Sequence, residues 1–263
     1  VRLVDEALRD KSLFNKRDGL AAKDVTICDP AVGTGTYLLG VLRQIAKSVE
    51  ADKGAGAVAA EVEKAASRMF AFEMQFGPFA VAQLRLIAEM QALSGSLIPP
   101  IPNLYITDTL GDPYAAETQF SSMVAPIAAS RKEANRIKRE QPITVVIGNP
   151  PYKNQAAGLG GWIEGRQEAE AVRARRSGDA SPAPMDLWSP PPEWGIGAHT
   201  HHLKNLYVYF WRWATLKVFG SGHREAVGGN RDGSGIICFI TVSGFLNGPG
   251  FQKMRAELRG DAG

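Results

Sequence analysis

VTICDPAVGTGTYL, residues 25–38, is the stretch that decides the fold. Its first four residues form a short apolar run rich in β-branched side chains, which is typical of a buried strand. Gly33 and Gly35 predict a tight turn, and a helical pattern begins at about Thr36. Such a turn lets the backbone approach a ligand without an intervening Cβ, beside the unpaired N–H groups of the helix N-terminus.

The turn differs from the two commonest nucleotide-binding patterns. A dinucleotide-binding fingerprint would have a third glycine at position 38, where this chain has Leu38. A phosphate-binding P-loop would need Gly-Lys-Ser or Gly-Lys-Thr, which the turn lacks. A tight turn that binds nothing remains the simplest alternative for this stretch taken alone.

The pattern of a short apolar run followed by a helix repeats along the chain. The run at 143–148 is almost continuously apolar, as expected for a strand that is buried on both faces. This alternation predicts an α/β protein with a Rossmann-like, mostly parallel sheet and helices on both faces. The further strands are expected at residues 69–73, 103–107, 143–148 and 235–243.

The composition is that of an ordinary folded domain. The 263 residues are 44% hydrophobic and 22% charged, and the formal net charge of +3 is too small to indicate a nucleic-acid partner by itself. Cys28 and Cys238 lie in apolar runs and are expected to be reduced core thiols. No apolar run approaches the roughly 18 residues of a membrane span, and no secretory signal is visible, so we expect no membrane partner and a cytoplasmic location.

Acidic residues end the second and third predicted strands. Glu73 is well placed to accept hydrogen bonds from two ribose hydroxyls, and Asp108 from an exocyclic amino group. Either residue alone could be a solvated carboxylate at a strand end. Their joint occurrence after the glycine turn favours a nucleoside ligand.

The sequence NPPY, residues 149–152, follows the fourth predicted strand. Asn149 offers a side-chain carbonyl, and Pro150 offers a backbone carbonyl in a stiff, extended run. Two acceptors that face one pocket can bind both hydrogens of an NH₂ group, which keeps the nitrogen lone pair out of conjugation and able to attack a methyl group. Tyr152 adds a flat face for a planar substrate. An Asn-Pro turn beside a core tyrosine is the alternative.

Two long connections interrupt the pattern. A helical insertion is expected at about 115–141 and ends in RKEANRIKRE, whose five basic and two acidic residues suggest an exposed, charged helix. An irregular loop is expected at about 153–202. No cysteine lies near its HTHH segment, residues 199–202, so we predict solvated histidines and no metal site.

Several of these segments together resemble a known family. DPAVGTGTYL, FAFE, YITD and VVIGNPPY, in this order, are similar to motifs I to IV of the gamma-class adenine-N6 DNA methyltransferases. With LGGWIE after NPPY, the combination looks like the large single-chain (type ISP-like) restriction–modification enzymes. VRLVDEALR resembles the tail of the motif that precedes the glycine turn in that class, although its usual Thr-Pro start is missing.

The resemblance implies S-adenosylmethionine as the cofactor and double-stranded DNA as the partner. It assigns cofactor binding to Asp29, Pro30, Ala31, Gly33, Gly35, Glu73 and Asp108, and the target adenine to Asn149, Pro150, Pro151 and Tyr152. The family flips the target base out of the duplex, because N6 cannot be reached inside the stack.

The resemblance also describes the chain as one methyltransferase catalytic domain, residues 1–263. We expect it to be a fragment at both ends that lacks the C-terminal strands of the family's seven-stranded sheet. The parent chain would carry a target-recognition domain and could carry nuclease and helicase domains, in a restriction–modification or phage-defence system.

Other functions remain open at this point. A protein glutamine N5-methyltransferase or an RNA methyltransferase could use the same NPPY chemistry, although Asp29-Pro30 at the first strand favours DNA. An inactive DNA-binding fragment is the non-enzymatic alternative.

Overall fold

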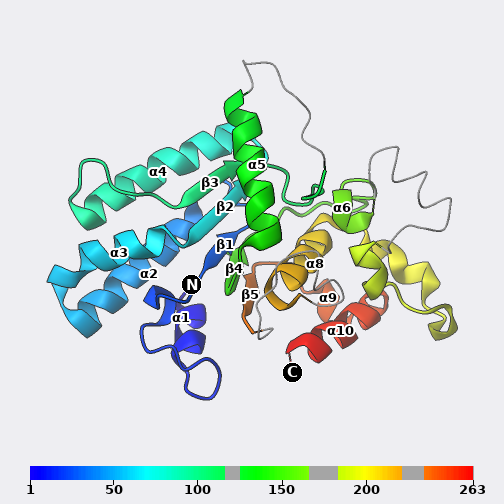
Figure 1. Ribbon diagram of the computed structural model, residues 1–263. Helices are drawn as coiled ribbons and strands as arrows, with labels where there is room; N and C mark the ends of the chain where they lie inside the picture. Colours follow the sequence, from blue (N-terminus) through cyan, green and yellow to red (C-terminus); the bar gives the residue numbers. More distant parts are fainter. Residues whose placement is uncertain (116–124, 166–182, 221–233, 263) are drawn as a thin grey trace.

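The computed structural model describes residues 1–115, 125–165, 183–220 and 234–262. A parallel five-stranded sheet with the order β3-β2-β1-β4-β5 runs through the middle of these residues (Figure 1). The strands are β1 (Ile27–Asp29), β2 (Met69–Glu73), β3 (Asn103–Ile106), β4 (Val145–Gly148) and β5 (Ile236–Phe239). Chain order reverses between β1 and β4, because the strands after β1 extend to one side and the later strands to the other.

Successive residues of the central strands enter two different hydrophobic cores. Val145 and Ile147 of β4 belong to one core, and Val146 between them belongs to the other. Since side chains alternate across a strand, the sheet is covered on both faces. Burial at the sheet thus confirms the predicted α/β, Rossmann-like class.

Four helices cover one face of the sheet (Figure 1). They are α1 (Arg2–Arg9), α2 (Thr36–Lys53), α3 (Val58–Ala66) and α4 (Phe76–Ser94). The other face carries α5 (Ala125–Glu140), α6 (Gly161–Glu164), α8 (Leu206–Phe219) and α10 (Gln252–Ala262), with α9 (Gly244–Asn247) nearby. Short 3₁₀ turns are η1 (Gly19–Ala21), η2 (Ala55–Ala57), η4 (Pro184–Trp188), η5 (Pro192–Trp194), η6 (Gly197–Leu203) and η7 (Pro249–Phe251).

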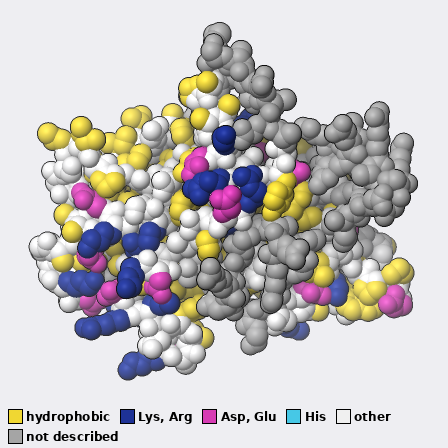
Figure 2. Space-filling model, in the orientation of Figure 1, with side chains coloured by type: hydrophobic (Ala, Val, Ile, Leu, Met, Phe, Trp, Pro, Cys, Tyr) yellow, Lys and Arg dark blue, Asp and Glu magenta, His cyan; other side chains and the backbone are white. Residues whose placement is uncertain are grey.

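The aromatic helix α8 packs against the sheet. Trp213 is buried, and its ring meets Phe72 of β2 edge to face at 6.0 Å. The charged helix α5 was predicted to be exposed, but its two last turns bury Ile137 together with Lys138. Figure 2 shows basic and acidic side chains mixed over the middle of the visible face. On the exposed side of α5, Arg136 and Glu133 form an ion pair.

The predicted insertion and loop are only partly described. Helix α5 occupies the end of the predicted insertion, while residues 116–124 lie outside the described part of the chain. The loop predicted at about 153–202 contains α6 and three 3₁₀ turns, and residues 166–182 lie outside the described part.

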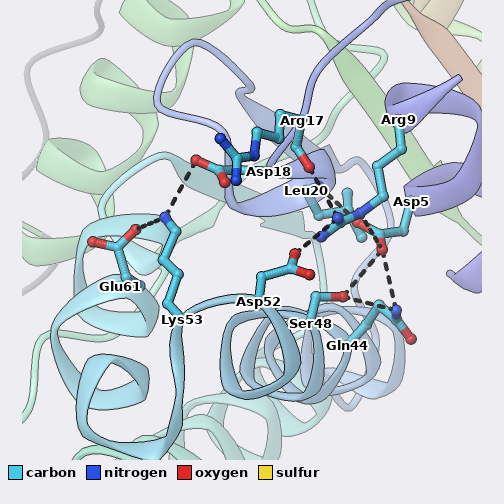
Figure 3. A network of polar contacts seen from close by, with 10 residues as sticks. All are labelled: Asp5, Arg9, Arg17, Asp18, Leu20, Gln44, Ser48, Asp52, Lys53 and Glu61. Atoms are coloured by element: carbon cyan, nitrogen blue, oxygen red, sulfur yellow. Dashed lines mark hydrogen bonds and ion pairs between the residues drawn. The ribbon is translucent and has the colours of Figure 1, made fainter. Parts of the chain in front are cut away.

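A polar network joins α1 to α2 (Figure 3). The buried carboxylate of Asp5 accepts hydrogen bonds from the Leu20 N–H and from the side chains of Arg9, Gln44 and Ser48. A buried carboxylate is stable only when it is paired in this way, so these bonds fix α1 against the helix that follows the glycine turn. No helix in the described residues is both long and apolar enough to cross a membrane.

Candidate functional site

The carboxyl ends of the parallel strands bring the predicted residues to one edge of the sheet. Asp29 and Glu73 end β1 and β2, and Asp108 and Asn149 follow β3 and β4. The crevice beside the point where strand order reverses is the usual ligand site in open α/β sheets. Here that point lies between β1 and β4, the strands that carry the glycine turn and NPPY.

The glycine turn is open at Gly33 and closely packed at Gly35. Gly33 has a φ of +54°, and a Cβ built there would meet nothing within 4 Å. Gly35 has a φ of +85°, and its Cβ would touch Ala82 of α4 at 3.4 Å. The turn therefore leaves room for a ligand at Gly33, whereas Gly35 permits the left-handed backbone and the contact with α4.

Asp29 is fully buried at the end of β1. Its Oδ1 accepts a hydrogen bond from the Ala31 N–H at 3.1 Å, but its Oδ2 has no partner among the described residues. Burial, with a smaller contribution from the charge of Glu73, raises the pKa of Asp29 to about 7. A buried carboxylate oxygen without a donor is costly, so this atom is suited to receive a cationic or N–H group of a ligand.

The two other acids are tied to the backbone and still have acceptor capacity. Glu73 accepts hydrogen bonds from Gly33 N at 3.0 Å and from Gln75 N at 2.8 Å. Asp108 is exposed and accepts one from Leu110 N at 3.0 Å. Since each carboxylate oxygen offers two lone pairs, both side chains can accept further hydrogen bonds from a ligand.

The start of NPPY lies against Asp29. A Cβ built on Gly148, the last residue of β4, would lie 2.7 Å from Asp29 Oδ1, so only glycine allows this approach. Asn149 is exposed, Pro150 is buried and Pro151 is exposed. No described N–H or O–H group donates a hydrogen bond to the carbonyl of Pro150.

Tyr152 covers the side of the site next to Asn149. Its hydroxyl lies 2.5 Å from Asn149 Oδ1 and 2.7 Å from the Ile240 carbonyl, and its ring lies 6.4 Å from that of Tyr207. The single phenolic proton can be donated to only one of these oxygens at a time. Asn149 can therefore exchange the tyrosine for another donor while the hydroxyl bonds to Ile240.

Three residues that the sequence analysis did not assign also belong to this edge. Tyr37 lies in the first turn of α2, and burial, then the charges of Asp29 and Tyr152, raise the pKa of its hydroxyl. Thr109 donates to the Pro30 carbonyl, which joins the turn after β3 to the glycine turn. Lys138 is the third, because its Nζ donates to the Asp108 carbonyl at 2.6 Å. Tyr37 follows the glycine turn directly and could have been found, but nothing in the local pattern marks Thr109 or Lys138.

The comparisons with known proteins concern the fold. No protein-family model matches the chain, and no curated protein matches it. Among solved structures, the chain is similar to a nuclease-deletion mutant of the Type ISP restriction-modification enzyme LlaGI in complex with a DNA substrate mimic, with a TM-score of 0.66, 21% identity and 98% of this chain covered. It is also similar to the ATP-dependent Type ISP restriction-modification enzyme LlaBIII bound to DNA, with a TM-score of 0.67, 22% identity and 97% covered.

A third similar structure is a DrdV–DNA complex, with a TM-score of 0.61, 24% identity and 98% of this chain covered. The chain spans only 18%, 15% and 21% of the lengths of these three chains. These likenesses show that nearly the whole chain shares one fold with a small part of each large protein.

Proposed function

We propose that this chain is the catalytic part of a DNA methyltransferase that transfers a methyl group from S-adenosylmethionine to N6 of adenine. The observation that carries the proposal is the contact between β1 and β4. Asp29, whose Oδ2 has no partner among the described residues, lies against Gly148, the last residue of the strand that leads directly into Asn149 and Pro150.

The residues at this edge fit S-adenosylmethionine. Asp29 would receive the amino group of its methionine part, with Pro30, Ala31, Gly33 and Gly35 forming the surrounding turn. Glu73 would accept from the ribose hydroxyls and Asp108 from the adenine amino group, and both have the acceptor capacity to do so. When bound, the cofactor supplies an electrophilic methyl group.

The NPPY residues would orient the nucleophile. Asn149 Oδ1 and the Pro150 carbonyl would each accept one hydrogen of the target amino group, leaving its lone pair directed at the methyl group. Asn149 Oδ1 has a second lone pair for this hydrogen, and the Ile240 carbonyl at 2.7 Å offers the Tyr152 hydroxyl another acceptor if it leaves Asn149. Catalysis would consist mainly of positioning and of acceptors already in place, and no side chain needs to remove the amino proton before attack.

DNA as the substrate, and a restriction–modification role, are supported by the proteins that share the fold. Two of them are restriction-modification enzymes, and all three are in complexes with DNA or a DNA substrate mimic. The target adenine would have to leave the duplex to reach this edge, because N6 is inaccessible inside the stack. We also propose that residues 1–263 form one catalytic domain of a longer chain with target-recognition and possible nuclease and helicase domains.

The test is methyl transfer by an Asn149→Ala variant. Duplex DNA is incubated with S-adenosylmethionine labelled in its methyl group, and the DNA is digested and assayed for labelled N6-methyladenine. We expect the variant to bind the cofactor as the wild type does and to lose transfer by at least about 100-fold, as for other residues that align or stabilise the reacting groups.

Asn154→Ala is the matched control, because Asn154 lies on the same segment and bonds to Asn205 outside NPPY. Transfer by Asn149→Ala at the wild-type rate would contradict the assigned role. If the wild-type chain transfers the label to RNA, or to glutamine in a protein extract, and not to DNA, then RNA or protein is the substrate and the proposal of DNA is wrong. A wild-type chain that binds the cofactor but transfers the label to none of DNA, RNA and protein would be an inactive fragment.

A further inference from the structure

The turn after β3 is held from two sides by buried polar side chains. Lys138 of α5, which is 1% exposed, donates from Nζ to the Asp108 carbonyl at 2.6 Å and to Thr107 Oγ1 at 3.2 Å. Thr109, which is 4% exposed, donates to the carbonyl of Pro30 in the glycine turn. All three bonds form at Asp108 or at a residue next to it, and the side chain of Asp108 itself remains exposed.

These bonds determine where the Asp108 carboxylate lies. The backbone on both sides of its Cα is fixed, since its carbonyl accepts from Lys138 and from Gly111 N at 3.1 Å, and Thr107 N donates to the Glu73 carbonyl at 2.9 Å. The carboxylate itself accepts from Leu110 N. Thr109 in turn fixes the distance from this carboxylate to the glycine turn that follows Asp29.

A purely structural role does not account for Lys138. Removing an ammonium group from water is costly, and an apolar side chain of similar length would fill the same space without that cost. The stem of Lys138 already lies in an apolar environment, with Nζ 5.6 Å from the centre of the Phe72 ring. A hydrogen-bond donor at this position does what an apolar side chain cannot: it fixes the turn that carries Asp108.

We propose that Lys138 and Thr109 are positioning residues that hold Asp108 in place to recognise the exocyclic amino group of the nucleoside. The proposal rests on the proposed function, because it concerns the nucleoside part of the same cofactor site. Lys138 lies on α5, Thr109 bonds from the turn after β3 to Pro30 in the glycine turn, and neither needs to contact the ligand. Selectivity for an amino-bearing purine then depends on two side chains outside the pocket.

The experiment compares two ligands that differ at one group. S-adenosylhomocysteine carries the amino group, and S-inosylhomocysteine carries an oxygen in its place. Titration calorimetry on the full chain is expected to give the wild type a preference of about 10- to 100-fold for the amino compound, the range expected for a hydrogen bond to a charged acceptor. Lys138→Met and Thr109→Val are each expected to reduce this preference to about threefold or less, mainly by weakening S-adenosylhomocysteine.

Ile137→Val is the matched control, because it removes a buried methyl group from the same turn of α5 without touching the Asp108 turn. We expect it to lower stability slightly and leave the preference unchanged, whereas Lys138→Met keeps its stability and loses the preference. Thr109→Val, which is nearly isosteric, keeps the test decisive if Lys138→Met does not fold.

An unchanged preference in Thr109→Val and in any folded Lys138→Met would overturn the proposal. Wild-type chain that binds both ligands equally would also overturn it, while leaving the cofactor assignment intact. Wild-type chain that binds neither would remove the cofactor assignment and this inference together.

Discussion

Asp29 combines complete burial with an oxygen that has no donor among the described residues. Its pKa is raised to about 7, chiefly by burial, so near neutral pH the protein holds a mixture of the charged and uncharged forms. A bound cation would favour the carboxylate and recover part of the cost of burying it. This residue therefore links cofactor affinity to pH.

The first prediction concerns that link. Cofactor affinity of the wild type should fall as the pH is lowered through about 7, because the uncharged acid cannot pair with a cation. Asp29→Asn should bind S-adenosylmethionine at least about tenfold more weakly and lose this pH dependence. Calorimetric titrations between pH 6 and 8.5 provide the measurement, and a variant that retains the wild-type profile would exclude Asp29 as the cation partner.

The same pKa makes a second prediction, on stability without ligand. The folded-state pKa of about 7 lies above the ordinary value of 3.8, so the folded protein retains a proton that the unfolded chain loses between these pH values. Stability should fall as the pH rises through this range, by at most about 4 kcal/mol from this group. Urea denaturation at pH 5 and pH 8 should show a smaller fall in the free energy of unfolding for Asp29→Asn than for the wild type. An equal fall in both proteins would show that Asp29 is not the titrating group.

Sequence reasoning found the acids at the strand ends but not the residues that hold them. Glu73 and Asp108 were identifiable because each directly ends or follows an apolar run. Lys138 was expected on an exposed helix, since five of the ten residues 131–140, Lys138 included, are basic, yet it is buried. Its burial depends on which side of α5 meets the sheet, and one-dimensional charge patterns do not contain that information.

At the scale of elements, strand length was harder to predict than strand identity. Val25 was expected to start the first strand and is buried, but its N–H bonds to the Ala22 carbonyl in a turn, and β1 begins at Ile27. The apolar pattern reports burial, which extends beyond the hydrogen-bonded ladder. Helix α4 begins at Phe76, before Gly77 and Pro78, because proline fits the first turn, where its missing N–H costs nothing.

A buried lysine of α8, Lys217, bonds to carbonyls in the last turn of α5, and this contact gives a third prediction. Lys217 donates to the carbonyls of Ile137 and Lys138 at 2.8 Å, and burial lowers its pKa to about 7, against weaker attractions to Cys28 and Glu140. Between that value and 10.5 the unfolded chain binds a proton that the folded protein lacks, so stability should rise with pH across this window. Lys138, with its pKa lowered to about 8 chiefly by burial, adds a rise of the same sign.

Lys217→Met should reduce the rise of the free energy of unfolding with pH without abolishing it, because Lys138 remains. The measurement is urea denaturation at pH 7 and pH 9.5, with Lys47→Met on the exposed surface of α2 as the control. A variant whose stability changes with pH as much as the wild type would show that Lys217 does not titrate in this way.

At the scale of the whole molecule, the sheet brings two motifs together that are more than 100 residues apart in sequence. The glycine turn ends β1 and NPPY follows β4, and only the reversal of strand order between them makes them neighbours. The class of fold was predictable from the alternation of strands and helices. The pairing of β1 with β4 was not, because it depends on contacts distant in sequence.

The fourth prediction follows from binding at this crevice. A ligand that binds only the folded state at 100 times its Kd stabilises it by about 2.7 kcal/mol. For a chain of this size, S-adenosylmethionine should then raise the midpoint of thermal unfolding by about 5–10 °C. Equal concentrations of ATP and NAD should have little effect, and a similar rise with either would indicate a different nucleotide site.

The central claim is that the transferable methyl group lies between the glycine turn and NPPY. The most direct test is to measure nuclear Overhauser contacts of the cofactor's methyl group. S-adenosylmethionine with a ¹³C-labelled methyl group is bound to a chain that is protonated only at its tyrosine rings. The account predicts contacts to the rings of Tyr37 and Tyr152. Each contact is assigned with the Tyr37→Phe or Tyr152→Phe variant, in which the substituted ring carries no protons and its contact disappears. Saturating binding with contacts to neither ring would place the methyl group elsewhere and contradict the account.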